Sequence, residues 1–309
     1  MKLGLLRRPD VLMVLTSAPA YVSTSEVLKV VDPLDLTPLR FLTAAAILGF
    51  HFALTRRQLV LRWSNAPKVF ATVALGYGVY VSLLNLGQRT VPAGTTSLLL
   101  NISPIFAFAL AYVFLGERSP RRGLAGMGLA TVGTVAVTIF GSATVGFDAN
   151  ALLVLAAALA LGLFLNLQQP LLATVPAAEM VFWGCLVSGV LTLPFARFDL
   201  KPDMWRPSTH FAFAALVILS TVLACVFWNR SLAATSVASG GALLFAIPVF
   251  SVLLGWLLQG QIPSVSALVG GGVALCGVVL LGKAQLGAPG ARPQGRFSRP
   301  PAPAQPQLE

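Results

Sequence analysis

Apolar residues in this chain gather into blocks of about 20, and most charged residues stand between those blocks or near their ends. A helix of about 20 residues is roughly 30 Å long, which matches the hydrocarbon core of a bilayer. Charged residues make up 10% of the 309 residues, whereas soluble domains contain about 25%. Charge therefore cannot cover a water-exposed surface, and the sequence predicts an all-α membrane protein with several spans.

The apolar blocks predict ten transmembrane helices. We place them at 11–31, 36–54, 69–88, 93–115, 121–140, 150–170, 176–196, 210–230, 235–258 and 264–282. The motif Ala18-Pro19-Ala20 fits a signal-peptide cleavage site, but the apolar run continues to Val31, so we expect an uncleaved first helix. Residues 284–309 are rich in Pro and Arg and almost devoid of apolar residues, which predicts a disordered tail.

Lysine and arginine indicate the orientation, because they are enriched in cytoplasmic loops. With the N-terminus inside, all but six of the 21 basic residues lie on the cytoplasmic side. The exceptions are Lys29, Arg40, Arg89, Arg197, Lys201 and Arg206. We expect a multi-pass protein of a cell membrane, a bacterial inner membrane, with both termini and the tail cytoplasmic. The net charge of +11 is a topology signal in this setting, and we expect no nucleic-acid partner.

The chain repeats itself at an offset of 144 residues. The matched pairs include Asn85 with Asn229, Pro104 with Pro248, Gly116 with Gly260, and Gly126, Gly128 and Gly133 with Gly270, Gly272 and Gly277. Each half has five expected spans, and an odd number makes the second copy enter the membrane from the opposite side. The sequence thus predicts two inverted five-helix repeats, 1–145 and 146–283, an architecture common among secondary transporters.

Residues typical of enzymes and metal sites do not cluster in this sequence. His51 and His210 are the two histidines, and they fall at opposite membrane faces. Cys185, Cys225 and Cys276 lie inside apolar blocks without CxxC spacing. We expect no enzymatic activity, no metal, no cofactor and no disulfide.

Glu26 is the most informative candidate site residue. It lies inside the first span, where an ionised carboxylate is costly unless it is paired or faces a cavity. Arg40 lies at a similar depth on the second span and is the expected partner, with Lys29 a weaker one. An ion pair and a coupling or substrate-binding role both remain open for Glu26.

Other polar and kink-forming residues fall within the spans. The candidates to line a central cavity are Tyr21, Tyr77, Tyr80, Asn101 and Trp183. Helix packing is the alternative for the aromatic residues, and a hydrogen bond to the carbonyl freed by Pro104 is the alternative for Asn101. Pro104 and Pro248 predict matched helix kinks. The glycines of the fifth and tenth spans allow close helix packing, either within a monomer or in a homodimer.

Several motifs together resemble the EamA-type transporters of the drug/metabolite transporter superfamily. They are Arg40-Phe41, Pro104, Leu115-Gly116-Glu117-Arg118 and the glycine-spaced fifth span. The resemblance covers residues 10–283, although Ser17-Ala18-Pro19-Ala20 replaces the usual Trp-Gly pair and Gln259-Gly260-Gln261-Ile262 replaces the second Leu-Gly-Glu-Arg motif.

The resemblance implies a substrate cavity between the repeats. It also implies a secondary transporter that exports amino acids or similar small metabolites by alternating access, with a small organic solute and the lipid bilayer as partners. A membrane scaffold or receptor-like protein without transport is the alternative.

Overall fold

The computed structural model describes residues 9–91, 99–100, 102–110, 121–141, 150–199 and 205–234, with residues 96, 113 and 203 and seven positions between 269 and 280. All regular structure in these residues is helical, which confirms the expected all-α class. The expected span 235–258, most of 264–282 and the tail 284–309 lie outside the described residues.

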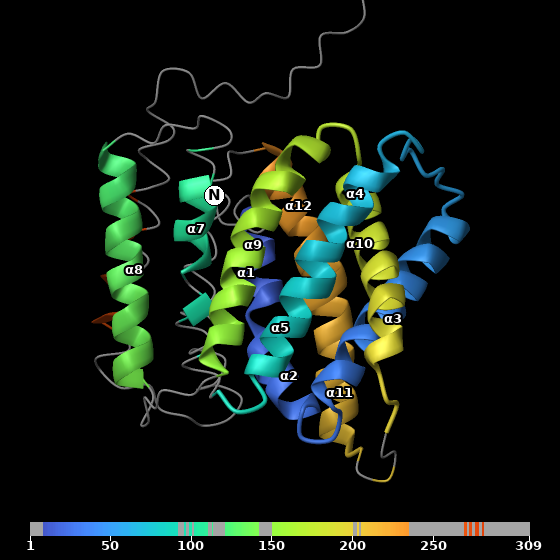
Figure 1. The fold of residues 1–309 in the computed structure, drawn as a ribbon, viewed down its shortest axis with the longest axis horizontal. Helices are drawn as coiled ribbons and strands as arrows, with labels where there is room; N and C mark the ends of the chain where they lie inside the picture. Colours follow the sequence, from blue (N-terminus) through green and yellow to red (C-terminus); the bar gives the residue numbers. More distant parts are fainter. Residues whose placement is uncertain are drawn as a thin grey trace, which may run out of the picture.

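The described helices follow one another along the chain (Figure 1). They are α1 (Pro9–Ser17), α2 (Pro19–Val27), α3 (Pro33–Leu54), α4 (Ala66–Val73), η2 (Ala74–Val79), α5 (Tyr80–Gly87), α7 (Ser103–Leu110), α8 (Arg121–Gly141), α9 (Ala151–Leu171), α10 (Ala177–Thr192), η4 (Leu193–Phe195), α11 (Pro207–Val217), η6 (Ile218–Leu223) and α12 (Ala224–Ala234). Within the described residues, five helical segments are long and apolar enough to cross a membrane: Pro33–Leu54, Ala66–Gly87, Ala151–Leu171, Ala177–Phe195 and Pro207–Ala233.

Proline and aspartate set two of the helix starts near the N-terminus. The expected first span is divided into α1 and α2 at Ala18, because Pro19 begins α2 and has no N–H group to donate. Asp32 caps α3, since its carboxylate accepts the N–H of Leu34 at 3.0 Å. Pro33 takes the first position of α3, where its fixed backbone angle favours the helix.

Helices of the first half pack against helices of the second half. α3 packs extensively against α10, on the side of the bundle opposite α8 (Figure 1). α1 packs on α12 and α2 on α11, while α9 packs on the continuous segment formed by α4, η2 and α5. The first segment of each half thus lies against the third segment of the other half. α8 lies at one edge of the bundle, on the far side of α7 (Figure 1).

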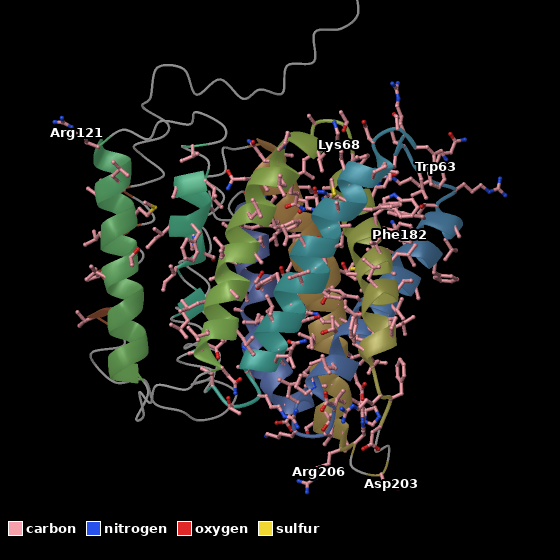
Figure 2. The ribbon with its side chains drawn as sticks, in the orientation of Figure 1. Trp63, Lys68, Arg121, Phe182, Asp203 and Arg206 are labelled. Carbon is pink, nitrogen blue, oxygen red and sulfur yellow. The ribbon has the colours of Figure 1, made fainter. Side chains whose placement is uncertain are left out.

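The largest core cluster lies where α3, η2, α9 and α10 meet. Phe41, Tyr77, Phe164 and Val181 are buried in it. Charged and aromatic residues mark the two ends of the bundle. Figure 2 shows Trp63, Lys68 and Arg121 at one end, and Asp203 and Arg206 at the other.

Candidate functional site

Two π-helical segments lie at matching places in the two halves. η2 starts at Ala74 and η6 at Ile218, and this offset of 144 residues equals the offset of the sequence repeat. π-Helical turns within α-helices are frequent at functional sites. The same offset relates Tyr77 of η2 to Thr221 of η6. Tyr77 packs against both α3 and α10, and Thr221 contacts α3.

Arg40 of α3 is held by η6. Its Nε donates to Thr221 Oγ1 at 2.6 Å, and its Nη2 donates to the carbonyl oxygen of Ser220 at 3.5 Å. The Thr221 hydroxyl in turn donates to the carbonyl oxygen of Leu216 at 2.8 Å. Arg40 is half-buried, whereas Thr221 is completely buried. The π-helical turn therefore supplies both acceptors that fix the guanidinium.

Tyr77 occupies the corresponding place in the other half. Its ring lies edge-on to Phe41 and to Phe164, with ring centroids 5.7 Å apart in each case. A Cβ at Gly184 of α10 would lie 2.8 Å from the Tyr77 ring, so only glycine fits there without movement. The Tyr77 ring is thus buried where η2, α3, α9 and α10 meet.

Two buried asparagines, again 144 residues apart, connect helices on either side of this region. Asn85 Nδ2 donates to Thr37 Oγ1 at 3.0 Å. Asn229 Nδ2 donates to the carbonyl oxygen of Ala177 at 3.3 Å, and Asn229 Oδ1 accepts from Gln168 Nε2 at 3.0 Å. Gln168 Oε1 is buried and has no partner among the described residues, so this polar region retains a free acceptor.

Glu179 fixes the first turn of α10 to the chain that follows α3. Its two carboxylate oxygens accept the backbone N–H of Val60 at 3.0 and 2.9 Å, and Oε1 also accepts that of Leu61 at 2.8 Å. Trp183 Nε1 donates to the same Oε1 at 3.3 Å. We call this arrangement the Glu179 clamp. The Trp183 ring also packs on Phe70, so the structure places Trp183 at this clamp.

Asp35 makes the reciprocal contact at the first turn of α3. Its Oδ1 accepts the backbone N–H of Arg197 at 2.6 Å and of Phe198 at 3.0 Å, directly after α10 and η4. We call this arrangement the Asp35 clamp. Its Oδ2 is buried and has no partner among the described residues.

The two clamps are related by the repeat, because Asp35 and Glu179 are 144 residues apart. Each begins one helix of the pair α3 and α10 and binds the segment after the other helix, so the two helices run antiparallel. Sequence reasoning did not single out either carboxylate. The 144-residue spacing between two acidic residues at the starts of matching spans was the signal that could have found them.

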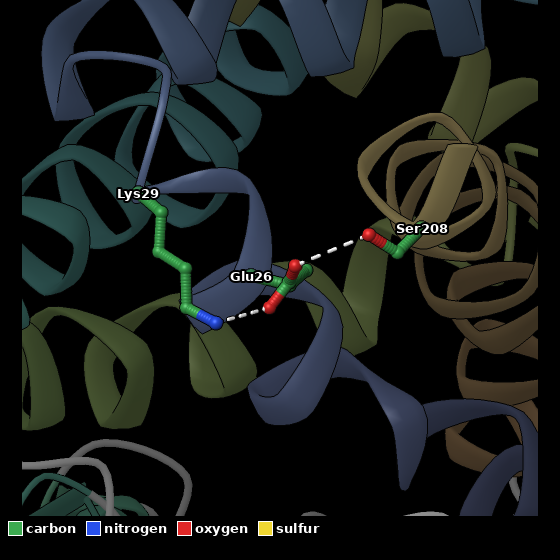
Figure 3. A network of polar contacts seen from close by, with 3 residues as sticks. All are labelled: Glu26, Lys29 and Ser208. Carbon is green, nitrogen blue, oxygen red and sulfur yellow. Dashed lines mark hydrogen bonds and ion pairs between the residues drawn. The ribbon is translucent and has the colours of Figure 1, made fainter. Parts of the chain in front are cut away.

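Glu26 differs from the expected arrangement. Its carboxylate binds Lys29 Nζ at 2.5 Å and accepts from Ser208 Oγ at 3.5 Å (Figure 3). Among the described contacts no ion pair joins Glu26 to Arg40, which instead binds η6. Lys29 reaches Glu26 because residues three apart share one face of a helix.

The remaining candidates are only partly described. Tyr80 begins α5, is half-buried and lies within electrostatic reach of Arg40. Tyr21 lies on α2, but its side chain is outside the description, as are Asn101 and Pro248 altogether. Pro104 is buried in the first turn of α7. The kinks at Pro104 and Pro248 stay predictions.

No described residues suggest metal chemistry. Among the part of the chain that the structure describes, no three His, Cys, Asp or Glu residues lie close enough together to hold a metal ion. The site instead offers one guanidinium, tyrosine and threonine hydroxyls, and amides. These groups suit the binding of a small polar solute.

The chain is similar to known transporters along most of its length. A probable terminal-alkyne amino-acid exporter of Streptantibioticus cattleyicolor is 33% identical over 231 residues, which cover 73% of this chain and 76% of the relative. An uncharacterized transporter of Archaeoglobus fulgidus is 24% identical over 262 residues, which cover 85% and 93%. A crystal structure with 23% identity and a TM-score of 0.76 covers 91% of this chain and 98% of its own, so the two share a fold.

A family model gives the identity of the chain. The EamA-like transporter family matches residues 11–139 and again residues 149–283, one match in each half. These matches confirm the resemblance seen in the sequence motifs and the presence of two repeats. The chain therefore belongs to the EamA-like transporter family.

Proposed function

We propose that this protein is a secondary transporter that exports amino acids or similar small metabolites by alternating access. The amino-acid exporter among its relatives supports this choice of solute. In this proposal ten helices form two inverted five-helix repeats in a bacterial inner membrane, with both termini in the cytoplasm. The Glu179 clamp then lies at the cytoplasmic end and the Asp35 clamp at the outer end.

The reciprocal clamps are the observation that carries the proposal. A carboxylate at the start of α3 holds the chain after α10, and a carboxylate at the start of α10 holds the chain after α3. Two repeats related by a two-fold axis in the membrane plane would generate this exchange. The exchanged packing of α1 on α12 and of α9 on α4 and α5 supports the same symmetry.

Alternating access follows from opening one clamp at a time. The hydrogen bonds of both clamps are formed in this structure. Arg40 on α3, Tyr77 on η2 and Tyr80 on α5 lie between the two clamped ends. Opening the Glu179 clamp would expose this region to the cytoplasm, and opening the Asp35 clamp would expose it to the outside. A symmetric pair of closures around one central site is the arrangement that inverted-repeat transporters need.

Transport by purified protein in proteoliposomes tests this proposal. We expect time-dependent uptake of at least one solute from a panel of proteinogenic amino acids and L-propargylglycine, a terminal-alkyne amino acid, above that of protein-free liposomes. Counterflow without a pH gradient measures solute exchange. Uptake that increases when a pH gradient is imposed indicates proton coupling. If the folded protein moves no member of the panel, the transport proposal for amino acids fails and the scaffold or receptor-like alternative gains.

A topology reporter tests the orientation separately. A reporter fused after Gly282 should read cytoplasmic, because 15 of the 21 basic residues lie on the side that we assign to the cytoplasm. A periplasmic reading would contradict either the number of spans or the orientation.

A further inference from the structure

Arg40 carries a positive charge within the helix bundle, and no carboxylate among the described residues pairs with it. It lies seven residues after the start of α3 at Pro33, or about 10 Å along the helix. A charged residue within a membrane span usually faces a polar pathway or a counter-ion. Thr221 and Ser220 are neutral hydrogen-bond acceptors, so they do not neutralise the charge of Arg40.

The acidic side chains that the structure describes in these helices are already bound elsewhere. Glu26 pairs with Lys29, and Asp35 and Glu179 bind backbone N–H groups at their clamps. Asp32 caps α3 and lies 3.9 Å from Arg89. The expected spans 93–115, 235–258 and 264–282 contain no Asp or Glu in the sequence, so they provide no counter-ion either.

The described hydrogen bonds of the Arg40 guanidinium involve only its Nε–Nη2 edge. Nε and Nη2 bind the η6 acceptors, which leaves three of the five N–H donors without a partner among the described residues. The free edge joins Nη1 and Nη2, the pair of donors that binds a carboxylate through two parallel hydrogen bonds. Arg40 is half-buried, so the described residues do not cover its whole surface.

The repeat shows that the scaffold itself does not need this charge. At the 144-residue offset, Gly184 takes the place of Arg40 and Tyr77 the place of Thr221. There a ring packs against a glycine, whereas in the other half a guanidinium binds a hydroxyl. One repeat thus has a cation at this position, and the other repeat has a glycine.

We propose that the free edge of Arg40 binds the carboxylate of the transported solute, so that the substrates are organic acids, including amino acids, and exclude their amides and amines. The proposal rests on the proposed transport function and names its substrate class. In it Thr221 and Ser220 orient the guanidinium. Losing a charge-assisted bidentate contact of this kind weakens binding by about 10- to 100-fold.

Three versions of one solute in proteoliposomes test the inference. The solutes are L-propargylglycine, its primary amide and but-3-yn-1-amine, and the proteins are wild type, Arg40→Lys, Arg40→Gln and the control Arg89→Gln. We expect wild type and Arg89→Gln to prefer the acid over the amide by at least tenfold. Arg40→Gln, which keeps a donor for Thr221, should lose that preference while its melting temperature stays close to wild type, and Arg40→Lys should keep part of it.

The outcomes separate this inference from the transport proposal. Transport that is equal for acid and amide, or an acid preference that survives in Arg40→Gln, overturns the Arg40 inference and leaves transport standing. If no solute is moved, the melting temperature of detergent-solubilised protein is measured with acetate, butyrate and benzoate against their amides at equal ionic strength. An increase with the acids that is absent in Arg40→Gln supports the anion site, and no increase in wild type overturns it.

Discussion

The Asp35 and Glu179 clamps occupy matching places but close the two ends of the protein unequally. Glu179 uses both oxygens and receives three donors, including Trp183. Asp35 uses only Oδ1 for two donors, and its buried Oδ2 has no partner among the described residues. A buried acceptor without a partner is unfavourable, so the Asp35 end is the weaker closure. In the proposed transport cycle, the protein would therefore open more readily at the Asp35 end.

Substituting Glu179 should have the largest effect. Glu179→Gln removes the charge and, with its carbonyl oxygen in the position of Oε1, turns an amide N–H toward the backbone N–H of Val60. We expect the free energy of unfolding to fall by about 3 kcal/mol, the upper range for hydrogen bonds to a charged group. Chemical denaturation in detergent measures this change. A loss below that of Asp35→Asn would reverse the order of the two clamps.

The centre of the molecule offers a second contrast between the halves. Gly184→Ala places a methyl group 2.8 Å from the Tyr77 ring, which is already enclosed by Phe41 and Phe164. We expect a destabilisation of about 2 kcal/mol from overpacking. Gly128→Ala is the matched control, because no atom of the described residues lies within 4 Å of a Cβ there, and it should be neutral or slightly stabilising. Equal stability of the two variants would show that Tyr77 is loosely packed.

Asp35→Asn should cost less than Glu179→Gln. The asparagine Oδ1 can still accept from Arg197 and Phe198, and its amide can occupy the position of the unpartnered Oδ2. We expect a loss of about 1 kcal/mol in the free energy of unfolding, measured under the same conditions. A larger loss would mean that Asp35 Oδ2 has a partner in the folded protein.

The smallest effect is expected at Glu26. Its partner Lys29 is 67% exposed, against 28% for Glu26 itself, and exposed ion pairs contribute about 0.5 kcal/mol. Glu26→Gln should therefore leave the melting temperature nearly unchanged. Gradient-driven flux is measured in parallel, because a flux that loses its pH dependence at unchanged stability would identify Glu26 as the coupling residue. If both stay at the wild-type level, Glu26 has neither role.

Much of the fold could be predicted from the sequence because bilayer thickness fixes helix length. The expected span 36–54 is observed as α3 (Pro33–Leu54), and 150–170 as α9 (Ala151–Leu171). The break at Ala18 was not predicted, although Pro19 was the signal for it. The π-helical turns η2 and η6 were not predicted either, because no local residue pattern distinguishes them from α-helix.

The site was harder to predict, since it depends on contacts between distant segments. Similar depth in the membrane suggested a pair between Glu26 and Arg40, but depth does not determine which helix faces a side chain presents. The structure turns Glu26 toward Lys29 and Arg40 toward Thr221. The clamps at Asp35 and Glu179 involve loop backbone, which carries no side-chain signal in the sequence.

Distances across both ends of the helix pair α3 and α10 test the central claim most directly. Spin labels are attached to genetically encoded unnatural residues, which leaves the native cysteines intact. One pair, at Leu54 and Thr174, reports on the Glu179 end, and the other, at Leu34 and Phe195, reports on the Asp35 end. Glu179→Ala, which removes the acceptor carboxylate, should lengthen the first distance without lengthening the second, and Asp35→Ala should do the reverse. If each of the two distances has the same value in wild type and in both variants, alternating access through the two clamps is contradicted.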